Sequence, residues 1–413
     1  MNIEELVRDS LREQASRHKS PAAGFADRVL AVRRRRMRRL ATVAAAAAAV
    51  IAVAVTVPLL DSGRTDVRPA QVIDGVVTHP DQWPPRDMIA VGRTALAAYY
   101  TADTVERTSV QGVFTRTYWL LDPRTEKYRK TTKWSYVAVA PGMHTAAVLE
   151  QSLPTHRIGI LDLTTGKVER WIQVERGVGG VEFSHDGSRL VATTYDENPD
   201  VRTRSAVNAE TGALDWVAPM GSSRSGFYVL DTASGAGTWS GVSAGREING
   251  RQDFAFSRTG EQVYSQVIGD RDGLQQFYDL DGNKIAAPAN ERYLRSDVDA
   301  RLSPSGRLAA LGLTKEVGGS PGKTKEAGAS PGKSYSSIRD PRTGKEITKV
   351  RGGHLLAWAD DRRLIAWERT TSLDEPYLPR LVMVTIGSDK VVPLSRIYKD
   401  IDKEFWEPVF ADR

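Results

Sequence analysis

The pattern of apolar and polar positions divides the chain into four segments. A charged N-terminal stretch, residues 1–39, is followed by an apolar run from Leu40 to Leu60 that contains no charge. Residues 61–86 are rich in proline, and beyond them short β-rich runs alternate with turns that contain Gly, Asp and Ser. Since helical periodicity is almost absent from this last part, we expect residues 87–413 to form an all-β domain.

The apolar run is long enough to cross a membrane. A helix over its 21 residues covers a hydrocarbon core of about 30 Å. Six arginines between Arg33 and Arg39 lie directly before it, and such cationic flanks stay on the cytoplasmic side. We therefore predict a single transmembrane helix over 40–60, with residues 1–39 in the cytoplasm and the β domain on the extracytoplasmic side of the cell membrane.

Two other interpretations of the apolar run are weaker. A buried helix in a soluble protein does not need an arginine block beside it. A cleaved signal peptide has a shorter N-terminal region than 39 residues, and Val57-Pro58-Leu59 lacks the small residues of a cleavage site.

The cytoplasmic segment has a helical pattern. Ile3, Leu6 and Leu11 share helical spacing, and Ser20-Pro21 is typical of a helix start. Two roles stay open for this segment. In the first, its arginines orient the anchor and bind anionic lipid. In the second, residues 1–32 bind a cytoplasmic protein partner.

A linker is predicted over residues 61–86. Pro69, Pro80, Pro84 and Pro85 lie within it, around Trp83. Proline lacks a backbone N–H group, so this density of proline resists both helices and sheet interiors.

One turn signature recurs through the β domain. It has an apolar residue, Ser or Ala, a polar turn that ends in Gly or Asp, and then a β-rich run. The strongest copies begin at Phe183 (FSHDGSRLVA), Phe256 (FSRTG) and Leu302 (LSPSGRLA), and weaker copies begin at Val139 and Trp358.

A second signature closes a hairpin and alternates with the first. Its copies contain Asp122, Asp162, Asp231, Asp279 and Asp340, mostly followed by Thr, Ser or Gly. Asp accepts backbone N–H groups within a turn and Gly tolerates positive φ. We expect these residues to form turns and to carry no chemistry.

The spacing of the second signature predicts the fold. Asp122 and Asp162 are 40 residues apart, and Asp231 and Asp279 are 48 apart. The two longer gaps contain insertions, one near 196–222 and one at 314–333. A period of 40–48 residues with four short strands per unit is typical of β-propellers.

We predict six blades, with a seventh only if the linker pairs with a closing strand at Trp406–Phe410. The six units are 87–131, 134–174, 179–242, 252–288, 298–350 and 353–395.

The repeat resembles a known type. The copies FSHDGSRLVA and LSPSGRLAA look like the WD-repeat-like propeller repeats of the TolB type, although the Gly-His and Trp-Asp pairs of true WD repeats are absent in register. With its basic N-terminus and Ala-rich anchor, the chain resembles uncharacterised single-pass propeller proteins of actinobacteria. This resemblance implies a fold but no particular function, because propellers include enzymes, receptors and scaffolds.

Charge argues against a nucleic-acid partner. The net charge of +6 comes entirely from residues 1–40, and residues 41–413 hold 46 basic and 46 acidic residues. A DNA-binding domain needs positive charge across a folded face. The chain also has no cysteine, so disulfides and thiolate chemistry are excluded.

Two sequence motifs look catalytic but lack their context. Gly241-Val242-Ser243-Ala244-Gly245 matches the nucleophile elbow, which needs an α/β sheet and downstream acid and His partners; only His354 lies downstream. Gly322-Lys323-Thr324 and Gly332-Lys333-Ser334 end phosphate-loop-like strings that have Val317 and Ala327 where glycine is required. We interpret the second pair as a duplicated loop.

We assign no functional site to the histidines, the tryptophans or the remaining aspartates. The six histidines show no metal-ligand spacing, and the nine tryptophans favour packing between blades over a sugar platform. Six aspartates would form a cation or acid–base site if they met at a propeller mouth, although solvated charge is the simpler interpretation. They are Asp81, Asp87, Asp297, Asp299, Asp360 and Asp361.

The sequence thus favours a membrane-anchored extracytoplasmic propeller that acts as a binding, sensing or protein-interaction module. We assign no catalytic, cofactor-binding or metal-binding residue, and expect a protein or small ligand as partner. One alternative is a propeller enzyme, a hydrolase or lyase for glycans or peptides, with its site at the channel mouth. Another is a transmembrane signalling protein whose N-terminal helix binds a cytoplasmic regulator such as a sigma factor.

Overall fold

The structure is a computed structural model, and part of the chain is described in it. The predicted segments 1–39 and 40–60 lie outside the described residues, as do parts of both predicted insertions. Residues 68–413 form one compact unit. The described residues are 71–73, 75–207, 214–219, 221–244, 251–267, 273–296, 298–317, 333–370, 378–398 and 405–413.

All regular elements within these ranges are β-strands, and the named strands pair antiparallel. The all-β prediction is therefore confirmed. No helix in the described part of the chain has the length and apolarity that a membrane crossing requires.

The strands form five hydrogen-bonded sheets in the described ranges. The first contains β1 (Gln71–Ile73), β2 (Val76–Thr78), β3 (Ala90–Val91), β4 (Thr94–Glu106), β5 (Gln111–Asp122), β6 (Lys127–Thr131), β12 (Val201–Val207), β13 (Leu214–Val217) and β27 (Trp406–Asp412). The second contains β7 (Trp134–Val139), β8 (Thr145–Glu150), β9 (Thr155–Asp162), β10 (Lys167–Phe183), β11 (Arg189–Tyr195), β14 (Arg224–Asp231) and β15 (Gly237–Gly241). The third contains β16 (Ala255–Phe256), β17 (Val263–Gln266), β18 (Gln275–Tyr278) and β19 (Lys284–Ile285). The fourth contains β20 (Ala309–Val317), β21 (Lys333–Arg339) and β22 (Glu346–Arg351), and the fifth β23 (His354–Trp358), β24 (Arg363–Thr370), β25 (Leu378–Thr385) and β26 (Val391–Pro393).

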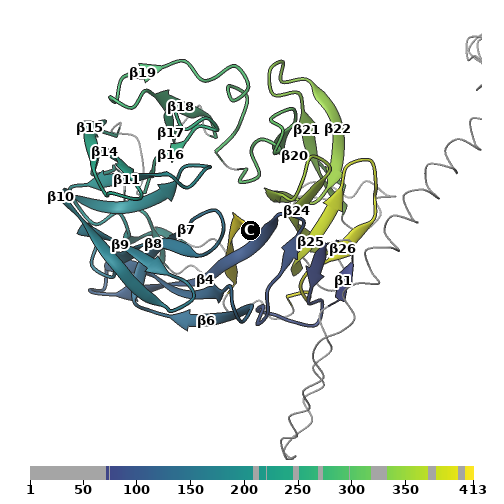
Figure 1. The fold of residues 1–413 in the computed structure, drawn as a ribbon, viewed down its shortest axis with the longest axis horizontal. Helices are drawn as coiled ribbons and strands as arrows, with labels where there is room; N and C mark the ends of the chain where they lie inside the picture. The colour runs from purple at the N-terminus through teal and green to yellow at the C-terminus, as the bar shows by residue number, and fades with distance from the viewer. Residues whose placement is uncertain are drawn as a thin grey trace, which may run out of the picture. The chain divides into compact units, whose positions relative to one another are not determined.

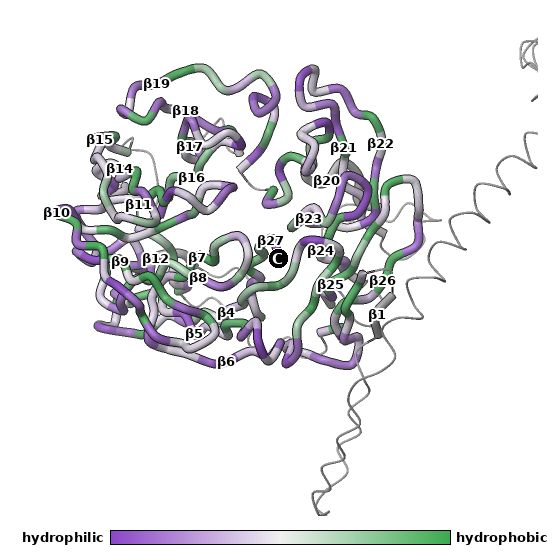
Figure 2. Tube along the Cα trace, in the orientation of Figure 1, coloured by the Kyte–Doolittle hydropathy of each residue, from purple (hydrophilic) through white to green (hydrophobic). Residues whose placement is uncertain are grey.

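The sheets stand around a common centre, with β4, β7, β16, β23 and β27 nearest to it (Figures 1 and 2). The long strand β10 joins two groups of strands. Its first part pairs with β9, and residues 178–183 pair with β11, with register shifts on either side of Val178. If β10 is divided at Val178, consecutive strands form antiparallel groups that match the predicted units. Strands β7 to β9 with the first part of β10 match the unit 134–174, and β23–β26 match 353–395.

The hydrophobic core lies between neighbouring groups of strands. Leu120 of β5 and Val148 of β8 belong to one buried cluster, and Ile160 of β9 and Leu190 of β11 to the next. The colours of Figure 2 agree, since apolar residues concentrate in the strands and polar ones in the turns. The predicted propeller requires that each sheet bury both of its faces against the neighbouring sheets.

Both turn signatures form turns, as predicted. Gly187, Gly260 and Gly306 of the first have φ of 73°, 73° and 70°, values that side chains with a Cβ rarely adopt. In the second, the Asp162 carboxylate accepts the backbone N–H groups of Thr164 (2.7 Å) and Thr165 (3.2 Å).

The insertion after β11 crosses to the first sheet, which the sequence did not predict. Its strand β12 pairs with β5, with Val201 opposite Val113 and Thr203 opposite Gln111. The N–H group of Phe114 also donates to the carbonyl of Asp200 at 2.8 Å. We call residues 196–207 the strap, because they tie the group around β11 to the group around β5.

The segment predicted as a linker is in part folded. Residues 71–78 form β1 and β2, and β2 pairs with β3. Trp83 packs against Trp367 and Trp406, with ring centroids 6.0 and 5.1 Å apart. With β1 and β2, these contacts make the described residues of 71–86 part of the folded unit.

The C-terminal segment forms a strand at the position expected for a closing strand. This strand, β27, pairs with β4, with Trp406 opposite Thr101 and Asp412 opposite Thr94. It lies on the side of β4 opposite to β5, at the centre of the ring (Figure 1). The last strand of the chain therefore completes the first group of strands.

Candidate functional site: the central cavity

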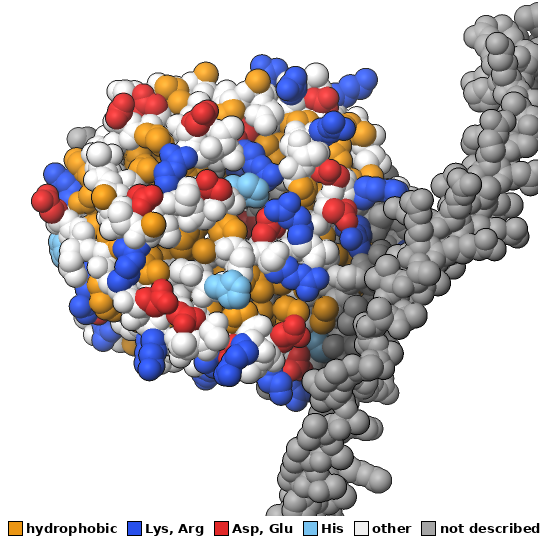
Figure 3. Space-filling model, viewed as in Figure 1, with side chains coloured by type: hydrophobic (Ala, Val, Ile, Leu, Met, Phe, Trp, Pro, Cys, Tyr) orange, Lys and Arg blue, Asp and Glu red, His pale blue; other side chains and the backbone are white. Residues whose placement is uncertain are grey.

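A cavity of about 610 Å³ occupies the centre of the ring. It is lined from β7, β10, β16, β23 and β27 and from residues 299–302, so every group of strands contributes. The face in Figure 3 is hollowed near its middle, where histidine, cationic and acidic side chains gather among apolar ones. We call the end beside the first-signature turns the turn end, and the other the opposite end.

The repeat explains which side chains face the cavity. On β7, Trp134, Tyr136 and Ala138 are partly exposed, while the residues between them are buried, as expected for side chains that alternate across a strand. Counted back from the first-signature turn, Ala138 is equivalent to Glu182, Ala255, Arg301 and Ala357. Ala138 and Ala357 line the cavity with small side chains, and Glu182 and Arg301 place opposite charges there.

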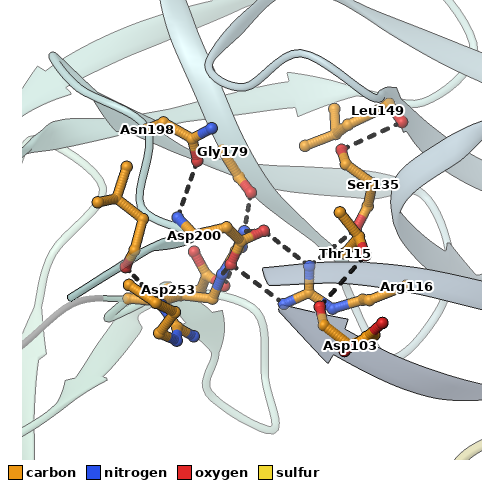
Figure 4. A network of polar contacts seen from close by, with 12 residues as sticks. Asp103, Thr115, Arg116, Ser135, Leu149, Gly179, Asn198, Asp200 and Asp253 are labelled. Atoms are coloured by element: carbon orange, nitrogen blue, oxygen red, sulfur yellow. Dashed lines mark hydrogen bonds and ion pairs between the residues drawn. The ribbon is translucent and has the colours of Figure 1, made fainter. Parts of the chain in front are cut away.

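A buried ion network closes one side of the cavity toward its opposite end (Figure 4). Asp200 of the strap is 1% exposed and binds Arg116 of β5 (2.7 Å) and Arg251 (2.9 Å). Arg251 also binds Asp253 at 2.9 Å and the carbonyl of Gly179 at 2.6 Å. One carboxylate thus joins two arginines from different groups of strands.

The charges of this network stabilise one another. Burial raises the pKa of the Asp200 carboxyl, but Arg251 and Arg116 outweigh burial and hold this pKa below its ordinary value. The Arg251 guanidinium is placed over the Tyr136 ring, 4.9 Å from the centroid. Both arginines line the cavity, yet their charge is already matched by carboxylates.

A second arginine–carboxylate pair lies across the cavity. Arg301 binds Glu291, which is 1% exposed, at 2.7 Å and lies over the Tyr264 ring at 4.0 Å. Arg301 has a φ of 42°, a left-handed conformation that is rare for residues other than glycine and often found at functional sites.

Glu182 is different, because its carboxylate has no matched cation. No hydrogen bond or ion pair reaches it within the described part of the chain. Its side chain is exposed to the cavity, yet desolvation by the surrounding protein raises its pKa to about 7, with Arg301 opposing and Asp253 reinforcing the change. Such a carboxyl exchanges its proton near neutral pH.

Two more carboxylates lie toward the opposite end. Asp299 is 3.2 Å from the Nε2 atom of His354. Glu407 of β27 is exposed, and burial of its carboxyl, reinforced by Asp299, raises its pKa. Of these two residues, Asp299 lines the same cavity as Glu182.

The turn end is polar as well. Arg93 forms an ion pair with Asp412, the last residue of β27. The Arg258 guanidinium donates to the carbonyl of Pro304 at 2.8 Å. Burial lowers the pKa of His185, and Arg258 adds to this effect, so His185 is held neutral at physiological pH.

The aspartates that the sequence offered as a mouth cluster are spread out. Of the five that are described, only Asp299 lines the cavity. Asp87 accepts a hydrogen bond from Gln82 at 2.7 Å, and Asp81 borders a separate pocket of about 420 Å³ beside Trp83. Asp360 pairs with Arg363 at 2.6 Å, and Asp361 accepts the N–H group of Ser305 at 2.9 Å; Asp297 lies outside the described residues.

The other sequence motifs show no chemistry in the described ranges. Ser243 is exposed on the segment after β15. Most of the duplicated decapeptide lies outside the described residues. No group of three or more His, Asp or Glu side chains is placed to hold a metal ion within those residues.

Sequence reasoning missed Glu182, Arg301 and the Asp200 network. A signal for the first two existed, because the repeat copies have Ala at the equivalent positions 138, 255 and 357 but Glu at 182 and Arg at 301. Asp200 had no such signal, since its partners are 84 and 51 residues away in the chain.

Comparisons with known proteins identify no family for this chain. No family model matches it, and no curated protein matches it. Among solved structures it is similar to hydrazine synthase of Kuenenia stuttgartiensis, at 14% identity and a TM-score of 0.35 over 66% of this chain and 68% of that one. It is also similar to a chain of a mitotic checkpoint complex, at 13% identity and a TM-score of 0.36 over 85% and 90% of the two chains. At these values neither similarity supports an assignment of function.

Proposed function

We propose that this chain is a single-pass membrane protein that presents a six-bladed propeller outside the cytoplasm as a ligand-binding module. The ligand occupies the central cavity. The observation that carries this proposal is the convergence of charged side chains from different groups of strands on one space of about 610 Å³.

The size and lining of the cavity support a small polar ligand. Ligand pockets in proteins have volumes of about 300–1,000 Å³ and combine apolar walls with a few polar groups. Here the walls include Val181, Phe183 and Leu356, while Glu182 and Arg301 supply charge. A site for a flat protein partner needs an exposed apolar surface, which this recessed and charged cavity does not offer.

The membrane anchor rests on the sequence alone. The apolar run 40–60 and the arginines before it support a cytoplasmic N-terminus and an extracytoplasmic propeller. With this topology a ligand outside the cell would be sensed by the propeller, and residues 1–32 would be free to bind a cytoplasmic regulator.

An enzyme is the second candidate, and Glu182 favours it. A carboxyl with a pKa of about 7 suits a general acid or base at neutral pH. The nearest acid partners, Asp253 and Asp299, line or approach the same space. This candidate predicts turnover of a bound glycan or peptide fragment, lost on substitution of Glu182.

Thermal unfolding of the full chain in detergent micelles tests the proposal. The test set contains amino acids, neutral sugars, amino sugars, carboxylates, phosphate esters and quaternary amines. A binding module predicts that at least one compound at 100 times its Kd stabilises the fold by about 2.7 kcal/mol, with the compound recovered intact. Failure of the entire set to raise Tm contradicts a small-ligand site, and conversion of a bound compound favours the enzyme.

A further inference from the structure

We infer that the central cavity selects ligands with a positively charged nitrogen, and that the Glu182 carboxylate binds this group. The inference rests on the proposed function, since it names the chemical class of the ligand of the same cavity. The argument depends on which charges of the cavity are already matched.

The arginines that face the middle of the cavity have carboxylate partners. Arg116 and Arg251 share Asp200, and Arg251 also binds Asp253. Arg301 binds the buried Glu291. A ligand anion would have to replace these charge-assisted contacts, which are among the stronger interactions in proteins.

The carboxylates that face the same space have fewer partners. Glu182 has no ion pair in the described part of the chain. Asp299 contacts only His354 among the described ion pairs, and that contact is ionic only when the histidine is protonated. Among the described charges in this part of the wall, the Glu182 carboxylate therefore has no ion-pair partner that a ligand cation would have to displace.

The surroundings of Glu182 favour a cation that displaces its proton. Arg301 and Asp253 act on its carboxyl with opposite effects, and the Tyr136 and Tyr264 side chains lie close enough for their own ionisation to depend on it. The surrounding protein withdraws part of the water from the carboxylate, and this loss of hydration without a partner opposes its charge. A ligand ammonium group provides the missing partner.

The remaining lining limits the kind of cation. No cluster of acidic or histidine side chains in the described residues is arranged for a metal ion. Ala138 and Ala357 line the same cavity with small side chains, and Val181 and Leu356 add apolar surface. This arrangement fits an organic amine, an amino sugar or a quaternary ammonium compound.

Pairs of probes that differ in charge test the inference. The full chain in detergent micelles is titrated with choline and its neutral isostere 3,3-dimethylbutan-1-ol, and with glucosamine and glucose. We expect at least one cation to bind 10-fold or more tightly than its neutral partner. Glu182→Gln should remove this preference while the neutral partner keeps its affinity, and Glu261→Gln on the exposed surface should have no effect.

The outcomes separate this inference from the proposed function. If neutral sugars, carboxylates or phosphate esters from the wider set bind the cavity and neither cation is preferred, the inference is overturned and the binding module stands. A charge preference that survives Glu182→Gln also overturns it. If no compound of any class binds, both fail.

Discussion

The indole of Trp406 in β27 packs against the indole of Trp83, with ring centroids 5.1 Å apart. Trp406 is fully buried, and its strand β27 pairs with β4. Two segments of the folded unit that are more than 300 residues apart in the sequence thus hold each other.

Substitution of Trp406 should therefore destabilise the whole domain. Trp406→Ala removes a fully buried side chain and should lower the free energy of unfolding by about 3–5 kcal/mol. Phe405→Ala is the matched control, because Phe405 is adjacent but 37% exposed. Urea denaturation followed by tryptophan fluorescence measures both, and equal losses would argue against closure through β27.

The strap gives a second prediction. Asp200→Asn leaves Arg116 and Arg251 with one buried negative charge fewer, and removal of one partner from a buried ion network costs about 3–5 kcal/mol. The variant should unfold at lower urea concentration. Asp196→Asn, an exposed position of the same strap, should change stability little, and a small effect of Asp200→Asn would mean that the strap does not hold the cavity wall.

Glu182 predicts a particular dependence of stability on pH. Its pKa is about 7 in the folded protein, above its ordinary value of 4.5, so between these values the folded chain holds a proton that the unfolded chain releases. The contribution of Glu182 to the free energy of unfolding is therefore fully present below pH 4.5, where the residue is protonated in both states. As pH rises through 7, the unfolded chain gains more from ionisation than the folded chain, and this contribution is lost. Glu182→Gln should therefore raise Tm relative to the unsubstituted chain at pH 8 and not at pH 4.5. A Tm difference that is the same at both pH values would contradict the raised pKa.

The same titration should govern ligand binding. A cation needs ionised Glu182, so the affinity for choline, whose charge does not depend on pH, should increase between pH 6 and pH 8 in the unsubstituted chain. Isothermal titration at both pH values measures this, and Glu182→Gln should have a flat profile. An increase of the same size in the variant would assign the effect to another group.

The predicted topology is testable because the chain contains no cysteine. Single Ser16→Cys and Ser243→Cys variants of the full chain can be treated with a membrane-impermeant maleimide in intact cells. Ser243 is exposed, so we expect it to react at once and the N-terminal position to react only after permeabilisation. Reaction of both positions in intact cells would contradict the cytoplasmic N-terminus.

Local patterns were sufficient to predict the all-β class and the turns, but not β1, β2 and β12. The turns at Asp162 and Gly187 are fixed by hydrogen bonds and φ values within a few residues, so their sequence signatures are reliable. The site depends instead on side chains from distant segments. Asp200 reaches Arg116 across 84 residues, and no local pattern encodes such a pairing. Trp83 likewise gives no hint in sequence that its partner is Trp406.

The central claim is that the cavity binds a ligand, and filling the cavity tests it most directly. Ala357→Trp places an indole where Ala357 lines the cavity, and Ala233→Trp places one on an exposed hairpin turn. The compound that raises Tm most in the unsubstituted chain is titrated into both variants. We predict at least a 10-fold loss of affinity for Ala357→Trp and none for Ala233→Trp; unchanged binding to a folded Ala357→Trp chain would contradict the account.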